Sequence, residues 1–109
     1  DCLLFEPTSV EPFYFFEPSS KNPAHNCSAV DVDAPDPARF PRFFDAAPWH
    51  ASLEAGDLLF IPAWWPHAFF HHGEFHANLN FWWMPEAPRD NAISKRQRAL
   101  DELARARAG

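Results

Sequence analysis

Apolar and polar residues alternate along residues 65–72 and again along 75–82, on either side of Gly73. Side chains point to opposite faces of a strand in turn, so this alternation is typical of two β-strands. A glycine between them can take the positive φ that a tight two-residue loop requires. The pattern therefore predicts a β-hairpin whose loop is formed by residues 73–74.

The two faces of the predicted hairpin differ in character. In this register His67 faces Asn80 and Trp65 faces Trp82, with Asn78 on the same side, so that ligand-capable groups lie among large aromatic rings. Such a face is expected in a β-barrel whose interior is lined for chemistry. The opposite face is apolar and predicts a core; its residues are Ala68, Phe70, Ala77, Leu79 and Phe81.

Three further strands are predicted before the hairpin. Apolar runs at residues 2–5 and 13–16 flank a proline-containing turn, and a third run covers residues 58–61. Residues 19–50 are rich in Pro, Asp and Ala, which predicts a loop-rich segment with one short helix near residues 38–46.

The last twenty residues favour a helix. Asp90 and Asn91 are both good N-caps, and we predict a helix from one of them to about Ala108. Its apolar stripe is sparse, so it is expected to lie on the domain or to pair with a second copy as a homodimer. The pattern thus divides the chain into a mainly β unit at residues 1–88 and a helix at 89–109.

Composition supports a packed domain. Of the 109 residues, 47% are hydrophobic and 17% aromatic, which argues against a disordered chain.

No signal peptide is visible, and the longest apolar run is far short of the ~20 residues needed to span a bilayer. Cys2 and Cys27 match no metal or redox spacing. We expect an intracellular protein, cytoplasmic or nuclear, with no membrane contact. Because the chain starts with Asp1 in the middle of an apolar pattern, we expect a C-terminal part of something longer.

Charge is unevenly distributed. Residues 1–88 hold 12 acidic and 3 basic residues (net −9), whereas residues 89–109 hold 6 basic and 3 acidic residues (net +3). An acidic body does not attract nucleic acid, but a basic tail can contact phosphates. Lys95, Arg96 and Arg98 are therefore candidate RNA contacts. The alternative is a solvated helix that is rich in Arg because Arg is a good helix former.

Among the histidines, His67 is the best candidate for a metal ligand. His67 and His71 share a face but are ~13 Å apart at strand rise, too far for one ion. His71 and His76 can approach one another near the hairpin tip, but two histidines without a third ligand make a weak site. His67 follows Trp64-Trp65-Pro66 deep in its strand, where a neutral histidine needs a partner or a metal.

The motif GDLLFIPAWWPH at 56–67, followed by NFWW at 80–83, resembles the distal half of JmjC-type cupin oxygenases. The resemblance implies a mainly β fold, a partial double-stranded β-helix with a C-terminal helix, and the use of Fe(II) and 2-oxoglutarate. By position in the motif, His67 matches the family's second iron-binding histidine and Asn80 a polar position that contacts the cosubstrate. Trp65, Asn78 and Trp82 would line the pocket.

Further matches resemble the tRNA wybutosine-synthesizing hydroxylases within this family. They imply hydroxylation of a modified tRNA guanosine, although JmjC cupins also act on proteins and histones. These matches are Asp1-x-Leu3-Leu4, Thr8, Phe16-x-Pro18, Asp33-x-Pro35-Asp36, Phe40-Pro41, the SLEAGD motif at 52–57 and the tail from Ala92 to Leu103, which resembles their C-terminal helix.

The chain also departs from the family pattern. If Asp1 matches the second acid of the H-x-D-x-x-D motif, both proximal iron ligands are missing. Cys2 then replaces an asparagine that contacts 2-oxoglutarate, and Glu11 replaces the lysine that pairs with its carboxylate. In a second alignment, residues 3–7 match the family segment that residues 15–18 match in the first. The family's lysine would then lie before residue 1, and Glu11 would not replace it. We expect residues 1–109 alone to be inactive; the alternative function is a degenerate cupin that acts as a binding or dimerisation module.

Overall fold

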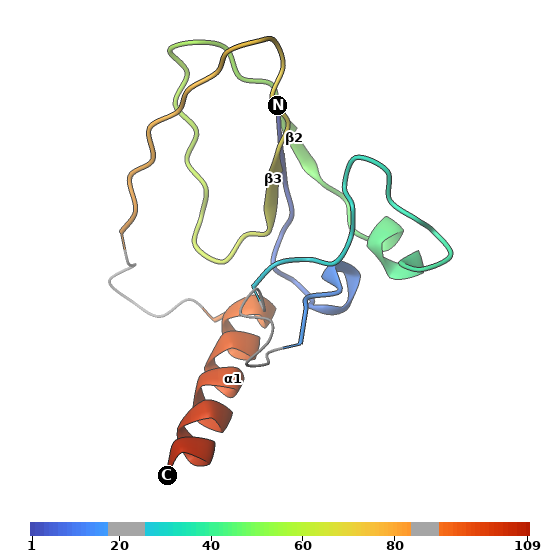
Figure 1. Cartoon of the computed structure of the whole chain (residues 1–109), viewed down its shortest axis with the longest axis vertical. Helices are drawn as coiled ribbons and strands as arrows, with labels where there is room; N and C mark the ends of the chain where they lie inside the picture. Colours follow the sequence, from blue (N-terminus) through green and yellow to red (C-terminus); the bar gives the residue numbers. More distant parts are fainter. Residues whose placement is uncertain (18–25, 84–89) are drawn as a thin grey trace.

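A three-stranded antiparallel sheet is the centre of the fold. The computed structural model describes residues 1–17, 26–83 and 90–109. The strands are β1 (Cys2–Leu4), β2 (Trp49–Ala51) and β3 (His67–Phe69), and β1 lies between the other two (Figure 1). The strand predicted at residues 2–5 is thus confirmed, and it pairs with segments some fifty and seventy residues further along the chain.

The register of this sheet decides which side chains share a face. Leu4 lies opposite Trp49 on one side and His67 on the other, and Cys2 lies opposite Phe69. Directly opposed residues of antiparallel strands point to the same face. The face that carries the buried Leu4 and Cys2 therefore also carries His67.

The small core lies where β1 meets two short 3₁₀ helices, η1 (Glu11–Phe13) and η2 (Pro41–Asp45). The Phe5 ring packs edge-on against Phe13 at 5.5 Å between centroids, and lies 5.8 Å from Phe43. Burying a phenylalanine contributes about 1.5–3 kcal/mol, so this cluster is a main source of cohesion. The buried apolar residues in the described part are Cys2, Leu4, Phe5, Phe13, Val30 and Phe40.

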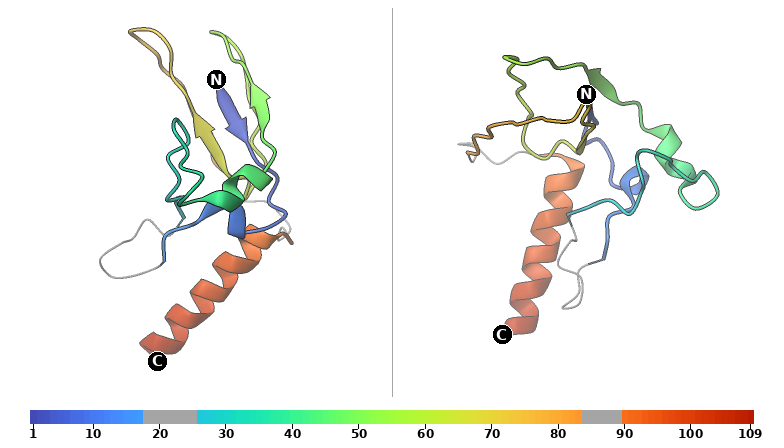
Figure 2. Two further views of the ribbon diagram at one scale, coloured as in Figure 1. Left: turned by 90° about the vertical axis from the view of Figure 1, so that its right-hand side faces the viewer. Right: turned by 45° about the horizontal axis from the view of Figure 1, so that its top comes forward.

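Helix α1 (Ala92–Ala108) begins at a capping box, which confirms the predicted C-terminal helix. The Asn91 side chain accepts a hydrogen bond from the Ser94 amide at 2.9 Å, and the Ser94 hydroxyl accepts one from the Asn91 amide at 3.1 Å. The Ala92 amide also donates to the Pro7 carbonyl at 3.2 Å. The helix is therefore fixed at its start, and from there it extends away from the sheet (Figures 1 and 2). No helix in the described part of the chain is both long and apolar enough to cross a membrane.

The predicted hairpin across residues 65–82 does not form. Residues 67–69 are a strand, but it pairs with β1, and residues 75–83 belong to no strand. Leu79 and Phe81, predicted for the core, are 79% and 73% exposed. A strand persists only where a neighbour satisfies its amides and carbonyls and a surface covers its apolar side. In the described residues, segment 75–83 has neither.

Three other local predictions are corrected. Residues 13–16 were expected to form a strand, but Phe13 ends η1 and Tyr14 has a left-handed φ of 45°. Among the described residues, only a single bridge joins Phe15 to Ser28. Residues 58–61 form no strand, because no described neighbour pairs with them. The short helix expected near 38–46 is the 3₁₀ helix η2, which Pro41 starts.

Replacing Asn91 by Ala removes one half of the capping box. We expect the free energy of unfolding to fall by about 1 kcal/mol, because the Ser94 amide loses its acceptor. Chemical unfolding followed by far-UV circular dichroism measures this change. Asn26→Ala, at an exposed asparagine outside the helix, is the matched control. Equal stability of the two variants would show that the cap contributes nothing.

Candidate functional site

The ring of His67 is held in a defined orientation. Its Nδ1 lies 3.0 Å from the Trp65 carbonyl oxygen, and because a carbonyl only accepts, Nδ1 carries the proton. In the neutral ring, Nε2 then has the free lone pair. This is the arrangement found in metal-binding histidines, whose second nitrogen donates to a carbonyl or carboxylate. The side chain is exposed and therefore accessible to a ligand.

The backbone before His67 is bent and anchored. Trp64 has a φ of 69°, which is unusual for a bulky residue, and the Trp65 amide donates to the Pro62 carbonyl at 3.3 Å. The Pro66 carbonyl accepts a hydrogen bond from the Phe5 amide at 2.9 Å, next to the β1–β3 ladder. The turn therefore delivers His67 to β3 in a fixed position beside β1. Left-handed backbone at such a residue costs of the order of 1–3 kcal/mol.

Cys2 lies on the same sheet face as His67 and is fully buried. Burial raises the pKa of its thiol above the ordinary value, while the nearby terminal ammonium group of Asp1 has a smaller, lowering effect. The thiol is therefore neutral at physiological pH and acts as a small apolar group. The sheet face that carries His67 is therefore packed with buried apolar groups at Cys2 and Leu4.

Asn80, Asn78 and Trp82 all lie on the exposed segment 75–83. The Asn80 amide nitrogen donates to the Asn78 side-chain oxygen at 3.5 Å, and Trp82 is 87% exposed. The prediction that Asn80 faces His67 across a hairpin is wrong, since β3 pairs with β1 instead. Trp65, by contrast, stays next to His67 through its carbonyl.

Two histidine contacts lie at the end of the sheet. The rings of His71 and His76 stack with centroids 3.8 Å apart, which confirms their predicted approach. The Asp1 carboxylate contacts His72 at 2.6 Å and His50 at 3.3 Å. Sequence reasoning missed this second cluster, because no local pattern relates residues so distant along the chain.

The described residues do not form a complete metal site. Among residues 1–17, 26–83 and 90–109, no group of three or more His, Cys, Asp and Glu side chains could hold a metal ion. A facial triad for Fe(II) requires two histidines and one carboxylate. The free Nε2 of His67 fits one of these three positions, and the described residues do not fit the whole group.

The three candidate RNA contacts are engaged within the chain. The Asp90 carboxylate pairs with Lys95 at 3.5 Å and with Arg98 at 3.2 Å. Arg96 lies over the Phe15 ring at 4.9 Å and donates to the Phe16 carbonyl at 3.2 Å, so it fastens α1 to residues 15–16. Exposed ion pairs contribute at most about 1 kcal/mol, so a phosphate could compete for Lys95 and Arg98.

Comparison with known proteins decides the family. A family model described as "Cupin-like domain" matches residues 1–89. The chain belongs to the cupin-like domain family. The JmjC resemblance is also confirmed, since the similar proteins are JmjC proteins.

Two kinds of relative are similar at modest identity. Lysine-specific demethylase 8 of Xenopus tropicalis is 35% identical over 80 residues, 73% of this chain and 17% of that protein. The tRNA wybutosine-synthesizing protein 5 of Homo sapiens is 36% identical over 81 residues, which are 74% of this chain and 23% of that protein. The protein of the same name from Mus musculus is 38% identical over 80 residues, 73% of this chain and 23% of that protein. The chain thus spans about a fifth of the length of these relatives. No solved structure matches it.

The tautomer of His67 is directly testable. We expect its neutral ring to carry the proton on Nδ1, because the Trp65 carbonyl accepts from that atom. Long-range ¹H–¹⁵N correlation spectra distinguish the two tautomers, and His67→Gln assigns the signals. His76, which has no such carbonyl partner among the described contacts, is the comparison ring. A His67 proton on Nε2 would contradict the structure.

Proposed function

We propose that this chain is the distal part of a JmjC-type cupin hydroxylase, in which His67 supplies one iron ligand. The observation that carries the proposal is the ring of His67, whose Nδ1 is held by the Trp65 carbonyl and whose Nε2 is free. This histidine ends the motif that resembles the family, and the family model extends over it. Cupins of the JmjC type typically use Fe(II) and 2-oxoglutarate, which supply the oxidising chemistry when bound.

An exposed apolar surface supports a larger barrel. The rings of Phe60 and Trp83 stack at 6.1 Å, and both segments, 58–60 and 75–83, expose large apolar side chains. Large apolar patches on a protein usually mark an interaction site. In the proposed double-stranded β-helix, further strands cover this surface and carry the remaining iron ligands. Its exposed members are Leu58, Phe60, Phe75, Leu79, Phe81, Trp82 and Trp83.

In the complete barrel the other predicted site residues have distinct roles. Asn80 contacts 2-oxoglutarate, and Trp65, Asn78 and Trp82 form the pocket wall that excludes water. These roles require residues 75–83 to pair as a strand, so that Asn80 turns towards His67. A covering surface and a pairing neighbour are what that segment lacks in the described chain.

The proposed substrate is a modified guanosine in tRNA. The human and mouse relatives carry the name tRNA wybutosine-synthesizing protein 5, and helix α1 offers Lys95 and Arg98 for phosphate contacts. Another relative is named lysine-specific demethylase 8, which makes a protein substrate the rival.

A binding or dimerisation module is the second candidate function. Helix α1 extends away from the sheet (Figure 2). Leu103, on this helix, is 55% exposed. In one of the two alignments, Glu11 also replaces the lysine that pairs with 2-oxoglutarate, and a carboxylate there repels that anion.

The first test uses the 109-residue chain with Fe(II) and 2-oxoglutarate. We expect no steady release of succinate, because one histidine cannot hold catalytic iron. A titration with Co²⁺, followed by NMR, should broaden the His67 signals first, and His67→Ala should abolish this effect while His50→Ala does not. Stoichiometric iron with continuous succinate release would refute the one-ligand proposal. Broadening independent of His67 would refute its role as a ligand.

The second test addresses the second candidate function, dimerisation through α1. If α1 joins two copies, sedimentation of the whole chain should give twice the monomer mass, and a chain ending at residue 89 should be monomeric. Leu103→Glu should also dissociate the dimer, and Glu102→Gln should leave it intact. If each of the four proteins sediments with its own monomer mass, the dimerisation hypothesis is rejected.

A further inference from the structure

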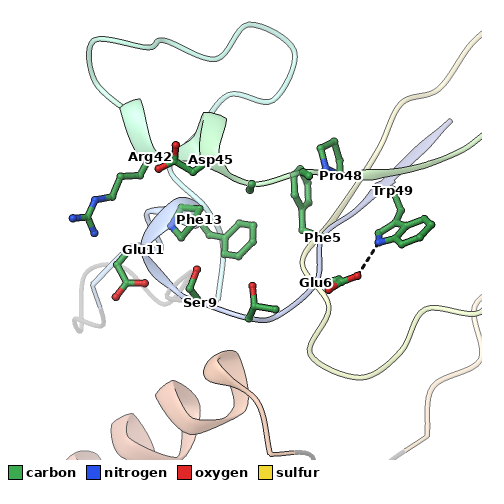
Figure 3. A pocket seen from close by; sticks show the side chains of 13 residues that line it. Phe5, Glu6, Ser9, Glu11, Phe13, Arg42, Asp45, Pro48 and Trp49 are labelled. Carbon is green, nitrogen blue, oxygen red and sulfur yellow. Dashed lines mark hydrogen bonds between the residues drawn. The ribbon is translucent and has the colours of Figure 1, made fainter.

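An open groove of about 780 Å³ lies at the end of β1 and is lined in part by Trp49 of β2, but not by His67. It is bordered by η1, η2 and the end of β1 (Figure 3). Its lining combines three aromatic rings, Phe5, Phe13 and Trp49, with several charged side chains. His67 is on β3, across the central strand, so the groove is separate from the proposed iron position.

The aromatic part of the groove is rigid. Phe5 and Phe13 are buried and pack edge-on at 5.5 Å. Trp49 is 61% exposed, but its indole N–H donates to the Glu6 carboxylate at 3.1 Å, which restrains the ring. An exposed, restrained indole is the preferred partner of a cation among the aromatic side chains.

The charges around the groove are mainly negative. Glu6, Glu11 and Asp45 contribute three carboxylates, and Arg42 the one cation among the lining residues. Neither Glu11 nor Asp45 forms an ion pair with another described residue. Glu6 uses one oxygen for Trp49 and keeps the other. A concave surface of one sign concentrates its field and attracts the opposite charge.

We propose that this groove binds the arginine side chain of a basic peptide. A guanidinium group is planar, so it can stack on Trp49 and donate hydrogen bonds to the Glu6 carboxylate, which lies beside the indole N–H (Figure 3). The alkyl part of the side chain matches the Phe5 and Phe13 rings. A bound anion is disfavoured by three carboxylates against one arginine. A metal ion is disfavoured because no three described ligands converge.

The test is an NMR titration of the whole chain with a Gly-Arg-Gly peptide blocked at both ends. We expect the Trp49 indole N–H signal, assigned with Trp49→Phe, to shift with the peptide concentration. Gly-norleucine-Gly, which keeps the alkyl chain without the charge, and Gly-Glu-Gly should leave that signal in place. A shift of equal size with the norleucine peptide would overturn the proposal, because binding would then be apolar only.

Charge-neutralising variants supply the second arm. Glu6→Gln, which keeps an oxygen that can accept from the Trp49 indole, should weaken arginine binding by up to about fivefold, since an exposed charge pair contributes up to about fivefold. Glu17→Gln, at an exposed site outside the groove, is the matched control. Both side chains are exposed, so the fold should persist, which the remaining amide signals report. Equal affinity in the two variants would refute the proposal.

This inference is independent of the iron proposal. His67→Ala should leave arginine binding unchanged, because His67 does not line the groove. If arginine binding fails while Co²⁺ still broadens His67, the groove proposal alone is wrong. The reverse result would reject only the proposed iron ligand.

Discussion

The pairing of β1 on both of its edges is the constraint on which the described structure depends. Three residues, Cys2–Leu4, carry hydrogen bonds to β2 and to β3, and the adjoining Phe5 anchors the aromatic cluster with Phe13 and Phe43. Because the partners of β1 lie far along the chain, this strand joins residues 2–4, 49–51 and 67–69 into one sheet. Loss of its pairing would release the segment that carries His67 and the segment that carries Trp49.

The same strand separates two chemically different regions. On the β3 side, a histidine with a free Nε2 lies next to a buried neutral thiol, and the surface is mostly apolar. On the β2 side, carboxylates surround aromatic rings. Because His67 does not line the groove, the two regions can be perturbed one at a time.

Local signals in the sequence predicted local structure well. The cap at Asn91 was sufficient to predict α1, and the apolar run at residues 2–5 was sufficient to predict β1. Caps and short apolar strands depend on nearby residues. The stacked pair His71 and His76 also followed from a single turn at Gly73. The motif before His67 was sufficient for the family.

The predictions that were wrong concerned contacts between residues distant in sequence. Alternation in residues 75–82 indicates a strand but does not say which strand it pairs with. In the structure, β3 pairs with β1 and not with residues 75–82. The contacts of Asp1 with His50 and His72, and the groove around Trp49, arise only when the chain has closed. The expected position of Asn80 opposite His67 was an inference about such a partner, and for that reason it could not be reliable.

The sheet order β2-β1-β3 leaves the outer side of both flanking strands unpaired within the described residues. Unpaired strand edges are templates for further chains, and here they adjoin exposed aromatic residues. The outer edges of β2 and β3 are therefore the places where a further strand, from this chain or another, could extend the sheet.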